Sequence, residues 1–189
     1  MNLRVQLTER KTPLRGLLDL AAGCYPRFLF GGDIRGPLPV FHFHQSSADA
    51  LEPCFQYLAE NGYSTVTSAA MTGWVREGVT PGERAVALCF DDGWASAWTV
   101  VAPLLKKYGL RGIVYVIPGR VRDADGVRPT LDDGRVDGHL DDGSDTPLAT
   151  WPEIQSMHSA GVMDVQAHTY SHAMIFCGEW LLEFVTPET

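Results

Sequence analysis

Two short polar clusters have the residue types and the spacing of a metal-dependent hydrolytic site. The first is the adjacent pair Asp91 and Asp92, and the second contains His168 and His172, four residues apart. Two imidazoles at this spacing can face one cation from a single helical turn or a tight loop. Together with one carboxylate they make a three-ligand set for Zn²⁺ or a similar divalent ion, with open positions for water and substrate.

Neither cluster is specific by itself. Asp-Gly is ordinary turn chemistry, and the triplet D-D-G recurs at 132–134 and 141–143. A pair of histidines is also common as helix caps or surface residues. Two adjacent carboxylates, however, diverge in extended or turn backbone, so one can bind a metal while the other faces the substrate as a general base. The combination suits hydrolysis of an amide or ester without a covalent enzyme intermediate.

The elements that must position these clusters are predicted strands. The segment 84–90 is a continuous apolar run, typical of a strand buried on both faces of a parallel sheet, and it ends at Asp91. The segment 162–167 ends at His168 in the same way. Because parallel strands carry their chemistry at their carboxyl ends, we expect the two clusters to converge on one edge of the sheet.

Strands and helices are expected to alternate along the rest of the chain. The remaining predicted strands are 38–44, 63–67 and 112–117, and the predicted helices are 50–60, 69–77, 95–108 and 150–160. This order predicts an α/β fold with parallel strands, either an open doubly wound sheet or part of a (β/α) barrel. Pro103 should kink the third helix or force an irregular turn. Thr150 and Glu153 have the spacing of a capping box.

Composition restricts the class of protein. The chain has 189 residues, which fits one domain, and its 45% hydrophobic and 20% charged residues are ordinary globular values. The absence of an apolar run of 18 residues argues against a transmembrane segment. A formal net charge of −8 argues against a nucleic-acid groove. The segment 122–147 holds eight Asp against three Arg and is expected to be a solvated excursion.

The N-terminus and the cysteines bear on location. Charged residues such as Arg4, Glu9 and Arg10 interrupt the early apolar stretches, unlike a signal peptide. The four cysteines are spread along the chain without a C-x-x-C pair, which favours free thiols in a reducing compartment. A cytoplasmic location is therefore the expectation.

The motifs CFDDG (89–93) and HTYSH (168–172), with the segments 103–119 and 150–161, resemble the polysaccharide deacetylase family over about residues 38 to 176. The resemblance implies a metal-dependent N-deacetylase of a carbohydrate, built on a distorted (β/α) barrel, and Zn²⁺ is the divalent ion that we expect. Matched position by position, Asp91 corresponds to the catalytic base. The residues that correspond to the metal ligands are Asp92, His168 and His172.

The family usually has further motifs after the histidine pair, including an arginine that orients the catalytic aspartate and a histidine acid. We expect these to be missing in their usual order, because the sequence ends at Thr189. The expected organisation is an N-terminal extension, 1–37, and a deacetylase-like domain, 38–189, with an incomplete or distorted barrel. Exposed strand edges would then favour a homo-oligomer.

A general acid and substrate contacts are expected elsewhere. Phe43-His44 resembles the Tyr-His signature of a permuted branch of the family, which makes His44 the expected general acid; His42 lies on the same face of the strand. The alternative is that both are ordinary strand residues. Trp94 and Tyr170 are predicted to contact the sugar. Two other functions stay open: a catalytically impaired metal- or carbohydrate-binding remnant, and a hydrolase of a small cyclic amide or ureide.

Overall fold

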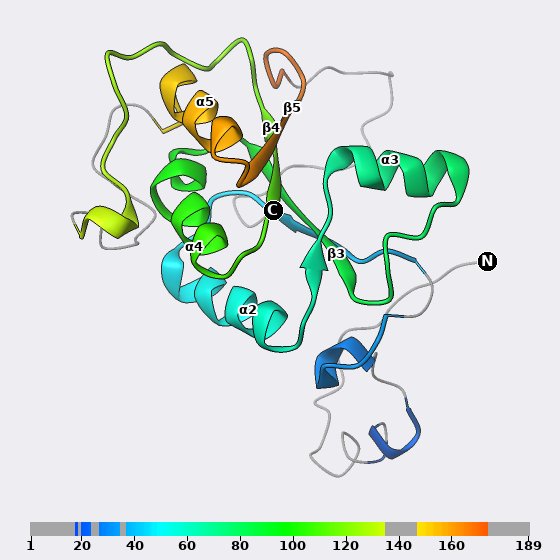
Figure 1. The fold of residues 1–189 in the computed structure, drawn as a ribbon. Helices are drawn as coiled ribbons and strands as arrows, with labels where there is room; N and C mark the ends of the chain where they lie inside the picture. The colour runs from blue at the N-terminus through cyan, green and yellow to red at the C-terminus, as the bar shows by residue number, and fades with distance from the viewer. Residues whose placement is uncertain (1–17, 19, 24–26, 35–36, 135–146, 174–189) are drawn as a thin grey trace, which may run out of the picture.

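The computed structural model describes residues 18, 20–23, 27–34, 37–134 and 147–173, which include five strands arranged as a parallel α/β structure (Figure 1). The elements are η1 (Arg27–Phe30), β1 (Val40–Phe43), α2 (Ala48–Glu60), β2 (Ser64–Thr65), α3 (Ser68–Glu77), β3 (Ala85–Asp92), the π-helical turn η2 (Ala97–Val101), α4 (Ala102–Lys107), β4 (Gly112–Val116), η3 (Leu131–Asp133), α5 (Trp151–Ser159) and β5 (Met163–Ala167). The predicted strands and helices are thus all present, with shifted ends.

The sheet has the order β1-β3-β4-β5, and every pairing is parallel. The short β2 pairs with the first two residues of β3, Ala85 and Val86. Strand β1 pairs with the residues of β3 that follow, from Ala87 to Phe90. All eight residues of β3 are buried, because this strand has neighbours on both edges and helices on both faces. The predicted α/β class with parallel strands is confirmed. Among the described strands β1 and β5 each have one neighbour, as expected for an incomplete barrel.

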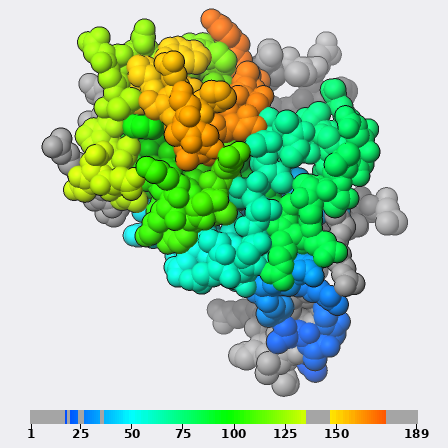
Figure 2. Space-filling view, in the orientation of Figure 1, coloured from blue at the N-terminus to red at the C-terminus, as the bar shows by residue number. Residues whose placement is uncertain are grey.

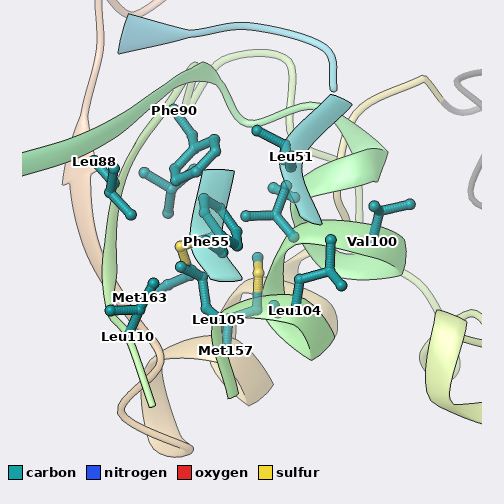
Figure 3. Packing of buried hydrophobic residues seen from close by; sticks show 14 of the residues in the cluster. Leu51, Phe55, Leu88, Phe90, Val100, Leu104, Leu105, Leu110, Met157 and Met163 are labelled. Atoms are coloured by element: carbon teal, nitrogen blue, oxygen red, sulfur yellow. The ribbon is translucent and has the colours of Figure 1, made fainter. Parts of the chain in front are cut away.

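The main core lies between one face of this sheet and the helices α2, α4 and α5. Leu88 and Phe90 of β3 point toward Phe55 of α2, and Leu104 and Leu105 of α4 complete the contact (Figure 3). Phe55 is fully buried. Burial of one such side chain contributes about 1.5–3 kcal/mol, so this layer holds β3 in place from one side.

Helix α3 packs on the opposite face of the sheet (Figure 1). Its Met71 and Trp74 contact a smaller cluster that includes Ala85, Ala87 and Cys89. These β3 side chains are small, so the helix can approach the strand closely. The sheet is therefore covered on both faces, and the carboxyl ends of its strands remain free to carry polar groups.

Two local predictions for the helices are met. Pro103 lies at the start of α4, directly after the π-helical turn η2, because a proline cannot donate an N–H to the carbonyl four residues earlier. At α5, the backbone N–H of Thr150 donates to Glu153 Oε2 at 2.8 Å, which is the predicted capping interaction.

Part of the predicted N-terminal extension packs on the domain. Tyr63 Oη donates to the Gly32 carbonyl at 2.7 Å, and Arg84 Nε donates to Asp33 Oδ1 at 2.8 Å. The ring of Phe28 contacts Phe41 of β1 at a centroid distance of 5.5 Å. Residues 27–34 thus pack against the sheet domain. The domain boundary expected at residue 37 stays a prediction.

The acidic segment 122–147 differs from the expected solvated excursion in its first half. Arg128 Nη2 lies 2.6 Å from Oε2 of Glu153, a fully buried residue in the first turn of α5. Burial raises the pKa of Glu153, but hydrogen bonds from Arg128 and Thr150 outweigh it and hold this pKa below its usual value. Figure 2 shows the yellow-green residues of this segment against α5. The Arg128 ion pair is the physical reason for the difference.

The expectations for the cysteines and for a membrane span concern the chain as a whole. Cys54 and Cys89 are free, as expected, whereas Cys24 and Cys177 lie outside the described residues. Burial raises the pKa of the Cys89 thiol, so this residue is a neutral core group. Over the described ranges, none of the helices is long and apolar enough to span a bilayer.

Candidate metal centre

The centre begins at the end of β3, which runs two residues further than predicted and includes Asp91 and Asp92. Asp92 has a left-handed backbone with φ +67°, and so does Gly93 with φ +68°. A Cβ at position 93 would lie 3.0 Å from Val116 Cγ1, so glycine permits both the turn and the close approach to β4. A non-glycine residue in this conformation is uncommon and is typical of functional sites.

The turn after β3 is fastened to the segment that precedes α5. The Ala149 N–H donates to the Gly93 carbonyl at 2.8 Å, and the Ala95 N–H donates to the Pro147 carbonyl at 2.7 Å. Trp94 and Leu148 form an isolated antiparallel bridge between these two hydrogen bonds. The position of the Asp pair is therefore set by two segments that are more than fifty residues apart in the chain.

The histidine cluster is held against the end of β4. The His168 N–H donates to the Val116 carbonyl at 2.8 Å, which continues the β4–β5 ladder. The Gly119 N–H donates to the Tyr170 carbonyl at 2.8 Å, and a Cβ at position 119 would lie 2.5 Å from that oxygen. His172 adopts a left-handed backbone with φ +51° at the end of this turn.

Asp92, His168 and His172 lie together with one ligand atom of each within 4.8 Å of the others. His172 Nε2 is 3.4 Å from Asp92 Oδ1, and the two histidine rings are 5.2 Å apart. Asp92 is 8% exposed, and its Oδ1 is buried without a hydrogen-bond partner among the described residues. A buried carboxylate oxygen beside two imidazoles fits a divalent metal, which would satisfy the oxygen.

Asp91 lies next to this cluster and faces imidazoles as well. His42 Nε2 is 3.3 Å from Asp91 Oδ1, and His168 Nε2 is 3.7 Å from Asp91 Oδ2. Asp91 is 9% exposed, so it is mostly withdrawn from solvent yet open to the site. The two adjacent carboxylates thus have different neighbours, which is the divergence expected from the sequence.

Of the two histidines from β1 and the residue after it, His42 contacts Asp91, whereas His44 is one ring further away. The contact with Asp91 comes from His42, and the His44 ring lies 6.0 Å from the His42 ring. Parallel pairing of β1 with β3 sets His42 opposite Cys89, two residues before Asp91. His44 follows the last residue of β1. The predicted acid role of His44 stays a prediction.

The two predicted substrate residues occupy different environments. Trp94 Nε1 donates to Asp92 Oδ2 at 3.3 Å, and Trp94 lines a pocket of about 560 Å³ that also includes His172. Tyr170 is 75% exposed, and its ring lies beside the turn at Gly119. Trp94 is thus part of the wall of the candidate site, whereas Tyr170 is exposed and does not line this pocket.

Sequence reasoning missed two residues of this pocket, Arg120 and Arg122. They follow the end of β4: Arg120 comes directly after Gly119, and Arg122 is the first residue of the acidic segment. The only signal in the sequence was their place after a strand, at the same edge of the sheet as the two clusters.

A carboxylate with two histidines at the carboxyl ends of parallel strands is a donor set for a divalent metal in an α/β fold. The family model for polysaccharide deacetylase matches residues 78–188, which is more than half of the chain. The chain therefore belongs to the polysaccharide deacetylase family, and this family and the cluster together indicate a divalent metal.

The chain is similar in sequence to curated proteins and in fold to solved structures. The chain is 27% identical over 129 residues to the poly-beta-1,6-N-acetyl-D-glucosamine N-deacetylase of Escherichia coli (strain K12), covering 68% of this chain and 18% of the relative. It is similar to the Streptococcus pyogenes deacetylase PplD in complex with acetate, with TM-score 0.53, 19% identity and coverage of 75% and 59% of the two chains. It is also similar to IcaB from Ammonifex degensii, with TM-score 0.51, 20% identity and coverage of 74% and 56%.

The chain spans less than two thirds of each of these relatives. The matches to solved structures have low identity, and they support the fold alone.

Proposed function

We propose that this protein is a metal-dependent hydrolase that removes N-acetyl groups from a carbohydrate by cleaving the amide C–N bond. The observation that carries the proposal is the cluster of Asp92, His168 and His172 with Asp91 beside it. Membership of the polysaccharide deacetylase family supports the same reaction and a carbohydrate substrate.

The proposed ligands of the metal are Asp92, His168 and His172, and their mixed oxygen and nitrogen donors favour Zn²⁺. A bound divalent ion polarises the amide carbonyl and makes water a stronger acid near neutral pH. In the protein, His168 Nε2 also lies 3.7 Å from Asp91 Oδ2, so this histidine adjoins both the proposed ligand set and the proposed base.

Asp91 is the proposed general base. One of its carboxylate oxygens accepts a proton from the attacking water, the water oxygen bonds to the acetyl carbon, and the C–N bond then breaks. The products are acetate and the free amine of the sugar. His44 is the proposed acid that protonates the leaving amine, and His42, which contacts Asp91, is the neighbouring candidate for that proton.

The remaining predictions complete the proposal. Trp94 stacks on the sugar from the wall of the pocket, and Tyr170 contacts it from the exposed side. A homo-oligomer is proposed because β1 and β5 are edge strands within the described sheet. A cytoplasmic location is proposed from the charged residues near the N-terminus and from the widely spread cysteines.

The test is release of acetate from N-acetylglucosamine oligomers, measured with and without a chelator, together with the metal content of the purified protein. We expect close to one divalent ion per chain and acetate release that the chelator abolishes. His168→Ala with His172→Ala should remove the metal. Asp91→Asn should keep the metal and lower acetate release by about 10²–10⁴-fold.

His158→Ala is the matched control, because His158 is exposed on α5 and lies outside the cluster. Metal retained in the double histidine variant would refute the ligand assignment. Normal metal content without acetate release would instead support the metal- or carbohydrate-binding remnant.

A further inference from the structure

The pocket at the candidate metal centre is lined by two groups of polar residues, the proposed metal ligands and two arginines. Its volume is about 560 Å³, within the range of ligand sites. Asp92 and His172 of the candidate metal centre line it, and so do Arg120 and Arg122 from the loop after β4. One cavity is therefore lined both by residues of the proposed reaction centre and by two arginines.

The loop that carries the two arginines is anchored on both sides. The Gly119 N–H donates to the Tyr170 carbonyl at 2.8 Å, which joins the start of the loop to the histidine turn. The Trp151 N–H donates to the Arg122 carbonyl at 3.0 Å, which joins its end to the first residue of α5. The backbone of Arg120 and Arg122 is thus fixed relative to the metal centre, and both residues are exposed to solvent at the pocket that they line.

The charge of this pocket is opposite to that of the molecule. The chain has a formal net charge of −8, yet two arginines and a single carboxylate, that of Asp92, line the pocket. Within the part of the chain that the structure describes, Arg120 and Arg122 make no ion pair with a carboxylate. Asp123, the acidic neighbour in the loop, instead accepts a hydrogen bond from the Ala124 N–H at 3.1 Å.

Arginine suits one kind of ligand group. Its planar guanidinium donates two parallel hydrogen bonds to a carboxylate or a phosphate, and this geometry gives specificity as well as energy. We propose that Arg120 and Arg122 select an N-acylated amino sugar that carries an anionic oxygen group on the same ring as the scissile amide. This deepens the proposed function and rests on it for the reaction, but recognition of the anion depends only on the pocket.

The experiment measures binding to the metal-free protein, because carboxylates and phosphates also bind metal ions directly. The probes are N-acetylglucosamine, its 6-phosphate and 2-acetamido-2-deoxyglucuronic acid, titrated at low ionic strength and followed by NMR shift changes. Both anionic sugars should bind about tenfold more tightly than the neutral sugar, because one charged hydrogen bond in a solvent-accessible pocket contributes about that factor. The two anionic probes distinguish a phosphate from a carboxylate.

The variant Arg120→Gln with Arg122→Gln should bind all three sugars equally, with unchanged thermal stability. Arg76→Gln is the control, because Arg76 is an exposed residue in the last turn of α3 and does not line the pocket. Preference for an anion that survives the double variant, or its absence in the wild-type protein, would overturn the proposal. Preference for an anion without acetate release by the metal-loaded protein would refute the proposed reaction and leave the anion site standing.

Discussion

Replacing Arg128 with methionine should destabilise the protein strongly, although Arg128 lies in a segment that looks like a solvated loop. The Glu153 carboxylate is fully buried and accepts hydrogen bonds from Arg128 N at 3.0 Å, Nε at 2.7 Å and Nη2 at 2.6 Å. Methionine preserves much of the length of the side chain but leaves the charge of Glu153 without its main partner. Removing one member of a buried ion pair costs about 3–5 kcal/mol.

The lower end of this range applies here, because the Arg128 side chain is 20% exposed and water can reach it. A loss of about 3 kcal/mol corresponds to a fall in melting temperature of about 6–12 °C for a chain of this size. Calorimetry or thermal denaturation followed by circular dichroism measures it. Lys107→Met is the matched control, because Lys107 and Glu52 form an ion pair of similar chemistry at the surface.

The pH dependence provides a second check of the same reasoning. In the wild-type protein the pKa of Glu153 is lowered by folding, so its contribution is present above the unfolded pKa of about 4.3 and is lost as pH falls through the folded pKa. In Arg128→Met burial should raise this pKa above the unfolded value, so the variant's deficit should shrink on acidification. Equal melting temperatures for the Arg128 and Lys107 variants at neutral pH would refute the argument.

The other predictions concern the turn at the site and the core. Gly119→Ala should displace the histidine turn, because its Cβ would lie 2.5 Å from the Tyr170 carbonyl oxygen, and metal affinity measured by titration should fall. Gly126→Ala, with nothing within 4 Å of its Cβ, should bind metal normally, and equal affinities would contradict this reading. Phe55→Ala should lower the free energy of unfolding by about 3–5 kcal/mol in denaturant titrations, because Phe55 is fully buried; a loss below 1 kcal/mol would contradict the packing described.

Much of the architecture follows from local patterns. The apolar run before Asp91 predicted a buried central strand, and β3 is buried at every residue. The proline at 103 predicted an irregular turn, and the π-helical segment η2 precedes it. These features depend on backbone chemistry and on which side chains avoid water, and both are properties of a short stretch of sequence.

The sequence by itself determined which residue types could bind a metal and that they follow parallel strands. Only the tertiary structure decided that His42 contacts Asp91, that Arg120 and Arg122 share a pocket with Asp92, and that Arg128 covers Glu153. The reason is physical. These contacts join residues far apart in the chain, and their partners are chosen by strand order and loop anchoring, to which no local periodicity corresponds.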